Sequence, residues 1–461
     1  MVSATRLARL VQTRSVRRSV LAGGTAAGGA WLIAACGAGA ATTQTKAPEK
    51  LAPATLRLLY RGGQYEVDFH AQRNPAFEQK YPGVKLEMES TAGSDHYTKA
   101  LAAAASGTPT DLVWSSSGSG GYFSFAVAKI ARQLDDLITR DKFDLKEYYE
   151  TSIKSLRREG KLFGVPILCH PSISMLWFNQ STLESVTNTL PDKSWTLDQL
   201  LELTKRLTKN TGDPNTSSWG YSVYTAPRGI KCMARAWGGE TFSADGKKSL
   251  FTTEPVVKSV TWIYDMMYTH RVAPTPDDLK SIQGGGATLF GNGRAPMTRS
   301  STSYLQTARD QVKPPAKYWA APHPRPVGAN TNNGSAWESD VWTMSPSTKY
   351  PEHAWKVMLH LTDKESGLTL AKLTGSLNGR PDVWHAPEVL NEHPIRKVLL
   401  ETMEAAQPWT TTYNTRFVEY EAKMTELLTP IWNGKQAPTK SYMEEADRQL
   451  QQVLDLPLPG A

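Results

Sequence analysis

Two carboxylates spaced two positions apart are the side chains in this sequence best placed to do chemistry together. Glu338 and Asp340 would face the same side of a β-strand, because successive side chains of a strand point to opposite faces. A glycosidase needs two carboxylates flanking a sugar bond, but these usually come from separate elements. The pair is therefore better suited to accept hydrogen bonds from ligand hydroxyls, or to serve as simple surface charge, than to act in acid–base catalysis.

Other catalytic patterns are weaker. The serine cluster Ser115–Ser119 has no neighbouring histidine and no G-x-S-x-G elbow, so we expect a loop at the end of a strand, where α/β folds place ligands. The nine histidines are scattered and form no H-E-x-x-H motif. Gly284–Gly286 lacks the Lys-Ser/Thr of a phosphate-binding loop. We expect neither a metal nor a cofactor.

Aromatic residues suggest a different chemistry. Thirteen of the 14 tryptophans follow Trp31, and several stand beside polar or glycine residues, such as Trp237 before Gly238 and Trp337 before Glu338. A flat ring next to polar side chains suits a carbohydrate, whose C–H face packs on the ring while its hydroxyls hydrogen-bond. Half-buried structural tryptophans would give the same pattern.

The first 35 residues resemble an export signal. They contain five arginines and no acidic residue, followed by a Gly/Ala-rich apolar run over 20–35. The residues before Cys36 resemble a bacterial lipobox, so we expect cleavage there and a lipid on Cys36. Arg17-Arg18 resembles a twin-arginine signal, although Val20 leaves the general secretory route open. The run is too short and too rich in glycine for a membrane-spanning helix.

Charge and cysteine content exclude some partners. The 52 Lys+Arg against 44 Asp+Glu give a net charge of +8, and removal of the five leader arginines reduces it to +3. No basic cluster suggests nucleic-acid binding. Cys169 and Cys232 lack metal-ligand spacing, and two buried free thiols are favoured over a disulfide.

The remaining chain of about 400 residues exceeds one core, so two domains are expected after a polar tether over 36–55. A strand at 56–60, a helix ending at 81–83, a strand at 84–88, a helix from Ser94 to Gly107 and a strand at 112–114 predict a mostly parallel α/β sheet. Three further helices with apolar stripes are expected from a capping box at Thr196 and Gln199 and from starts at Pro255 and Pro351.

Several short motifs occur in the order typical of one family. From Leu56 to about Leu454 the chain resembles the extracellular solute-binding proteins of ABC importers, in particular the sugar-binding family that includes maltose-binding protein. The stretches that carry the resemblance are FEQKYPGV at 77–84, AASGTPTDLVW at 104–114, GKLFGVP at 160–166, LWFN at 176–179, WTLDQL at 195–200, WGGE at 237–240 with DG at 245–246, and GSL at 375–377.

The resemblance implies a two-lobed α/β fold, like that of periplasmic binding proteins, with a ligand cleft between the lobes and hinge crossings beneath it. Lobe 1 would comprise 56–168 and 335–385, and lobe 2 would comprise 169–334 and 386–455. The expected crossings lie near 168–172, 332–336 and 386–394.

Site residues follow from the same resemblance. The positions that would line the cleft are Gln64, Tyr65, Ser115, Ser116, His170, Ser172, Trp237, Trp337, Glu338, Tyr413 and Arg416. Where the family often has a glycine-rich turn and a stacking tryptophan, this chain has the run from Arg299 and Ser300 to Tyr304. Tyr304 could take the place of the tryptophan ring. Arg299 and Arg416 would suit an anionic solute.

The sequence thus predicts a non-enzymatic receptor of an ABC importer that binds a sugar or related solute and delivers it to the permease. It would be exported and either held on the outer face of the cell membrane by its lipid alone or located in the periplasm. Two alternatives stay open: a receptor for an anionic solute such as a glycerol phosphate, and an exported carbohydrate-active hydrolase that uses Glu338 and Asp340.

Overall fold

A computed structural model of the chain describes residues 50–91, 95–118, 121–283, 286–329, 334–409 and 416–457. The leader, Cys36 and nearly all of the tether lie outside these residues, as do Ser94, Ser119 and Tyr413. Residues Glu49–Ala461 form one compact unit. None of the helices in the described ranges has the length and apolar character that a membrane crossing would require.

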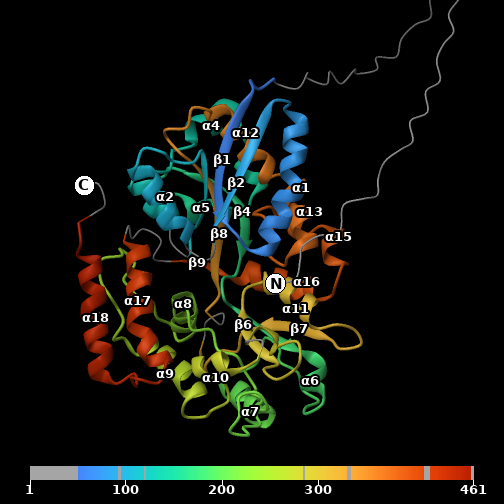
Figure 1. The fold of residues 1–461 in the computed structure, drawn as a ribbon, viewed down its shortest axis with the longest axis vertical. Coiled ribbons are helices and arrows are strands. Elements are labelled where there is room, and N and C mark those ends of the chain that lie inside the picture. The colour runs from blue at the N-terminus through green and yellow to red at the C-terminus, as the bar shows by residue number, and fades with distance from the viewer. Residues whose placement is uncertain are drawn as a thin grey trace, which may run out of the picture. The chain divides into compact units, whose positions relative to one another are not determined.

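A six-stranded mixed sheet organises the upper half of the body in Figure 1. Its strands run in the order β2-β1-β3-β8-β4, and a short β9 pairs with β8. The pairs β1–β2 and β1–β3 are parallel, whereas β8 is antiparallel to both β3 and β4. The strands are β1 (Ala54–Arg61), β2 (Val84–Thr91), β3 (Leu112–Ser116), β4 (Gly164–His170), β8 (Ala336–Met344) and β9 (Gln407–Pro408).

Helices pack on this sheet through large apolar side chains such as Phe69, Phe77 and Trp355, which are buried in its core. The predicted alternation of strand and helix in the first 60 folded residues is confirmed. The helices of this half are α1 (Gln64–Lys80), α2 (Asp95–Ala105), α3 (Tyr122–Val127), α4 (Asp135–Asp141), the 3₁₀ turn η1 (Leu145–Glu147), α5 (Glu150–Leu156), α12 (Pro351–Leu361), α13 (Lys364–Leu373) and α14 (Pro381–Trp384).

A second, three-stranded antiparallel sheet of order β6-β5-β7 lies in the lower half of Figure 1. The capping box at Thr196 and Gln199 is present. The strands of this second sheet are β5 (Met175–Asn179), β6 (Met297–Ser300) and β7 (Tyr318–Pro322). The helices of this half are α6 (Gln180–Glu184), α7 (Leu197–Leu207), α8 (Pro227–Ala236), α9 (Glu254–Met267), α10 (Pro276–Ser281), the 3₁₀ turn η2 (Gly286–Thr288), α11 (Tyr304–Gln311), α15 (Pro387–Leu390), α16 (Ile395–Ala405), α17 (Phe417–Trp432) and α18 (Lys440–Leu454).

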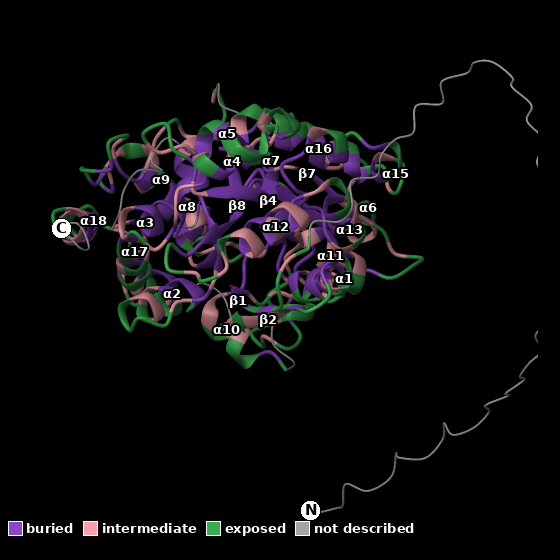
Figure 2. Ribbon diagram, turned by 90° about the horizontal axis from the view of Figure 1, so that it is seen from above, coloured by how far each residue is buried: buried purple, intermediate pink, exposed green. Residues whose placement is uncertain are grey.

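The chain passes between the two sheets more than once. It leaves the first sheet at the end of β4, enters the second at β5, and returns between β7 and β8. Strands β4 and β8 are buried along their whole length and lie in the middle of the body when it is seen from above (Figure 2). The end of β4 that leads to β5 and the start of β8 that follows β7 therefore lie where the two halves meet. The predicted lobe boundaries stay a prediction at residue level.

Candidate functional site

A cavity of about 440 Å³ lies between elements of the first sheet and helices of the second half. This volume falls within the range of small-molecule sites. We call it the cleft. Its first-sheet side is formed by Arg61, His96, Tyr97, Thr98 and Trp114, and its other side by Tyr224, Ala226, Pro227, Arg228, Val418, Glu421, Ala422 and Thr425.

Arg61 gives the cleft a flat, charged wall. Its guanidinium carbon lies 4.5 Å from the centre of the Trp114 ring, a cation–π contact. The same guanidinium donates to Glu66 at 2.9 and 2.6 Å and to the Tyr65 hydroxyl at 2.9 Å. Because three partners hold it, this group is already oriented before a solute arrives.

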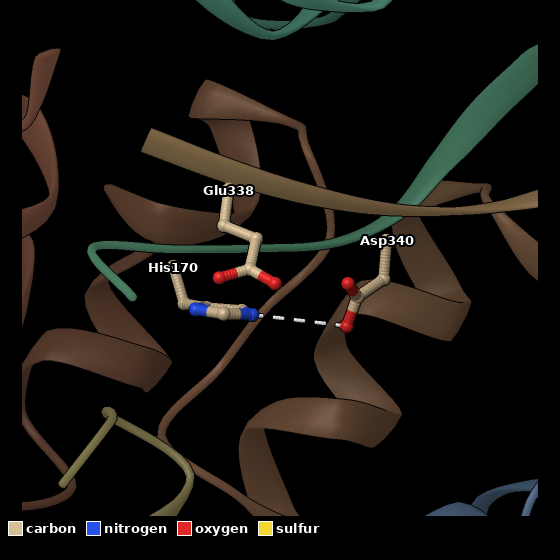
Figure 3. A group of neighbouring side chains, drawn as sticks. All are labelled: His170, Glu338 and Asp340. Carbon is tan, nitrogen blue, oxygen red and sulfur yellow. Dashed lines mark ion pairs between the residues drawn. The ribbon is translucent and has the colours of Figure 1, made fainter. Parts of the chain in front are cut away.

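A buried acidic cluster made of His170, Glu338 and Asp340 adjoins the cleft through Arg228, a lining residue that contacts Glu338. On β8 the two carboxylates share one face, as their spacing predicts, and β4 places His170 opposite Glu338 in the ladder. The side chains of the three residues converge in Figure 3, with one nitrogen or oxygen atom of each lying within 4.8 Å of those of the other two. All three are at least 95% buried.

Glu338 is fully paired within this cluster. Ser116 Oγ donates to its carboxylate at 2.7 Å, and Arg228 Nη1 lies 3.3 and 3.4 Å from its two oxygens. Burial by itself would raise the pKa of Glu338, but the charges of Arg228 and His170 and the Ser116 hydrogen bond outweigh it and lower the pKa to about 2. Glu338 is therefore an anion at neutral pH.

The proton of His170 is placed by a backbone contact. Ser172 N–H donates to Nδ1 of His170 at 3.1 Å, a contact made possible by the left-handed backbone of Ser172, whose φ is +54°. Since Nδ1 accepts, the proton of the neutral ring is on Nε2, which lies 3.7 Å from Asp340 Oδ2 (Figure 3). An Nε2 that carries a proton offers no lone pair to a metal. The cluster therefore does not fit a metal site in this arrangement.

Helix α8 reaches across the cleft with a row of cations. Arg228, Lys231 and Arg235 recur at helical spacing and so share one face. Lys231 Nζ donates to the carbonyl of Gly118 at 2.9 Å and pairs with Glu421 at 2.6 Å. It also lies over the rings of Trp409 and Phe417, at 4.7 and 4.1 Å from their centres.

The loop after β3 closes directly onto this row. A Cβ atom at Gly118 would lie 2.4 Å from both Glu338 Cδ and Trp409 Nε1, so only glycine fits there without displacement. Arg235 continues the row toward the chain's C-terminal part, where it pairs with Glu240 at 2.9 Å and donates to the carbonyl of Pro408. Sequence reasoning missed all three cations and Gly118, although the helical spacing of the cations was visible.

The structure brings some predicted site residues together and separates others. His170 and Glu338 meet in the cluster, Ser116 donates to Glu338, and Tyr65 contacts the cleft-lining Arg61. Ser115 and Ser172 are buried, and their hydroxyls have no hydrogen-bond partner among the described residues. Gln64 and Tyr65 lie in the first turn of α1 rather than in the expected loop, and Gln64 bonds only Asp68 at the surface.

Two predicted tryptophans lie elsewhere. Trp337 faces the opposite side of β8 from Glu338, packs edge-on against Tyr149 at 5.1 Å, and donates to Ser339 Oγ at 3.2 Å. Strand alternation makes it impossible for neighbours such as Trp337 and Glu338 to line the same side. Trp237 ends α8 and packs, half-buried, on the core of the second half.

The residues predicted near the missing family tryptophan are spread out. Tyr304 packs against Trp177 and Phe290, with ring centres 5.7 and 5.3 Å apart. Ser300 ends β6, and Arg416 pairs with Glu419 at 2.8 Å beside α17. Tyr413 lies outside the described residues.

Arg299 is buried without an acidic partner in the described ranges. Its Nε donates to the carbonyl of Ile173 at 2.7 Å, while its Nη1 and Nη2 have no hydrogen-bond partner there. Burial lowers the pKa of its guanidinium, because no carboxylate offsets the loss of hydration.

Comparisons with known proteins identify the family to which the chain belongs. Residues 62–367 match the family model described as bacterial extracellular solute-binding protein. Putative binding proteins of Brucella abortus strain 2308 and Brucella suis biovar 1 are each 25% identical over 293 residues, which is 63% of this chain and 67% of theirs.

Solved structures share the fold. An ABC substrate-binding protein from Listeria monocytogenes in complex with cycloalternan superposes with a TM-score of 0.76 at 16% identity, and a maltose/maltodextrin-binding domain from Bdellovibrio bacteriovorus bound to maltotriose with 0.73 at 18%. Each comparison covers 87% of this chain and 99% of the other. The predicted two-lobed α/β fold of periplasmic binding proteins is confirmed. The chain belongs to the bacterial extracellular solute-binding proteins.

Proposed function

We propose that this chain is the receptor of an ABC importer and that it captures a sugar or a related polyol in the cleft. The observation that carries the proposal is the cleft itself, which combines aromatic rings with fixed donors and acceptors from both halves of a solute-binding fold. The lining includes the rings of Tyr97, Trp114 and Tyr224 and the charged groups of Arg61 and Glu421. The structural relatives with cycloalternan and maltotriose support a polyhydroxylated solute.

Capture would proceed by closure of the two halves. The contacts of α8 with Gly118 and Glu338 join the second half to the loop after β3 and to β8. Such contacts form only when the halves approach, so they favour the closed arrangement once solute occupies the cleft. The closed surface would then be what the permease recognises.

The first prediction concerns the solute. In a thermal-unfolding screen of sugars and polyols, a true ligand at about 100 times its Kd should raise the free energy of unfolding by roughly 2.7 kcal/mol. Phosphate esters form a second arm, because the unpaired Nη atoms of Arg299 favour an anionic solute as a second candidate. If only phosphate esters raise the stability, the solute is an anion and the sugar proposal is wrong.

Turnover separates the receptor from the hydrolase alternative. A glycosidase acid needs a raised pKa, whereas that of Glu338 is lowered and its carboxylate is held by Arg228 and Ser116. We therefore expect the ligand identified by the screen to be recovered unchanged after long incubation. Release of product that Glu338→Gln abolishes would instead establish the hydrolase.

The second prediction concerns anchoring. We propose that export and cleavage leave Cys36 as a lipid-bearing first residue, joined to the folded body by a tether of about 20 residues that reaches at most about 70 Å. Cys36→Ala should release the protein from membranes into the medium while its solute affinity stays unchanged. Cell fractionation with palmitate labelling measures this. A variant that remains in the membrane fraction would contradict the anchor without affecting the receptor proposal.

A further inference from the structure

The charges around the cleft pair almost completely. Arg61 lies 2.6 Å from Glu66, Arg228 lies 3.3 Å from Glu338, and Lys231 lies 2.6 Å from Glu421. Each of these cations therefore has its own carboxylate. Asp340 is the carboxylate left over at the same place.

Asp340 is buried and unsatisfied. Its side chain is 1% exposed, and neither carboxylate oxygen has a hydrogen-bond partner among the described residues. His170 Nε2 lies 3.7 Å from Oδ2 of Asp340, which is too long for a hydrogen bond. A buried carboxylate without partners is strongly disfavoured unless something supplies donors and positive charge.

His170 turns one ring nitrogen toward Asp340. Its Nδ1 accepts the Ser172 N–H at 3.1 Å, which leaves Nε2 facing Asp340 Oδ2 at 3.7 Å. Arg61 and Arg228 act on Asp340 only through space, because their hydrogen bonds go to Glu66, Tyr65 and Glu338. Among the described residues, neither arginine donates a hydrogen bond to Asp340.

The position of Asp340 leads toward the cleft. Arg228 lines the cavity and lies 3.3 Å from Glu338, and the Glu338 and Asp340 carboxylates lie within 4.8 Å of each other. In Figure 3 the Asp340 carboxylate points toward the ring edge of His170. A donor group that reached Asp340 from the cleft would meet a carboxylate whose two oxygens have no hydrogen-bond partner among the described residues.

We propose that Asp340 binds a protonated amine of the solute, so that the ligand is an amino sugar or an amino polyol. The proposal rests on the proposed function, since it names the class of sugar. An ammonium group has only donors and carries the charge that Asp340 lacks, whereas a neutral hydroxyl supplies donors without charge. At Asp340 itself, an acidic sugar would place a second carboxylate beside the first and should be rejected.

The test uses matched solutes. Neutral sugars, their 2-amino-2-deoxy counterparts and their uronic acids are compared by calorimetric titration at pH 6.5, where the amines are protonated. The amino member of a pair should bind wild-type protein at least about tenfold more tightly than the neutral member, the usual scale of one charge-assisted hydrogen bond. The uronic acid should bind more weakly than both.

Variants assign the difference to Asp340. Asp340→Asn keeps the shape and removes the charge, so it should abolish the preference for the amine while neutral sugars bind within about threefold of wild type. Without ligand, this variant should unfold at or above the wild-type temperature, because an uncompensated charge is removed. The exposed Glu87→Gln is the control and should change neither property.

The outcomes are distinct. If neutral and amino sugars bind wild type equally, or if Asp340→Asn weakens both equally, Asp340 merely accepts hydroxyls and the amine proposal is wrong while the receptor proposal stands. If no sugar of any charge binds, the proposed function itself fails. If Asp340→Asn does not fold, the preference of wild-type protein for the amino sugar over the neutral sugar is measured again in Asp340→Glu. Retention of this preference supports the amine proposal, and its loss contradicts it.

Discussion

Replacement of Arg228 by methionine should destabilise the folded chain by about 3–5 kcal/mol, the cost of breaking a buried ion pair from one side. The Glu338 side chain is 1% exposed and that of Arg228 is 19% exposed. Little water can therefore solvate the Glu338 carboxylate once Arg228 is removed. Urea unfolding followed by far-ultraviolet circular dichroism measures the change. Arg132→Met, which removes the exposed pair with Asp136, is the matched control and should cost less than about 1 kcal/mol.

The pH dependence distinguishes this loss from a general packing defect. The pKa of Glu338 lies below its ordinary value in the folded protein, so the pair stabilises the fold above about pH 4.5, and this contribution disappears as the pH falls toward 2. The stability difference between wild type and Arg228→Met should therefore shrink over that window. A difference that does not vary with pH, or a cost at pH 7 below 1 kcal/mol, would contradict the pairing.

Gly334→Ala should have an effect of similar size through the backbone. Gly334 has φ +76°, and a Cβ there would lie 1.9 Å from the carbonyl oxygen of Cys232 and 2.9 Å from the backbone nitrogen of Ala236, both in or next to α8. Left-handed strain of about 1 kcal/mol and overpacking of about 1–3 kcal/mol should together cost about 2–4 kcal/mol. Because α8 must move, solute affinity should fall as well.

The chain offers a matched control for this substitution. Gly328 has φ +74°, but no atom lies within 4 Å of its hypothetical Cβ. Gly328→Ala should therefore show only the conformational strain, about 1 kcal/mol, with solute affinity preserved. Unfolding free energies and titration calorimetry on both variants separate strain from contact. Equal effects at the two glycines would mean that the approach to α8 is unimportant.

Local patterns in the sequence predicted local structure well. The strand–helix alternation after Leu56 gave the parallel part of the first sheet, and the capping box at Thr196 is formed. The spacing of Glu338 and Asp340 correctly put both carboxylates on one face. These features depend on neighbours close in sequence, which is why they were accessible.

The site depends on contacts between distant segments, and there sequence reasoning was incomplete. Trp337 was placed beside Glu338 by resemblance, although the period of a strand already separates them. Arg228 and Lys231 share a helix face visibly, but their partners Glu338 and Gly118 are more than 100 residues away. Only the packing of the two halves reveals that this face enters the cleft.

The basic row of α8 also bears on how long a captured solute would stay bound. From this one helix, Arg228 pairs with Glu338 of β8, and Lys231 and Arg235 donate to the carbonyls of Gly118 and Pro408. Opening would have to break these attachments almost simultaneously, whereas closing could form them in any order. Such an arrangement slows escape more than entry, so differences in affinity among solutes would appear chiefly as differences in residence time.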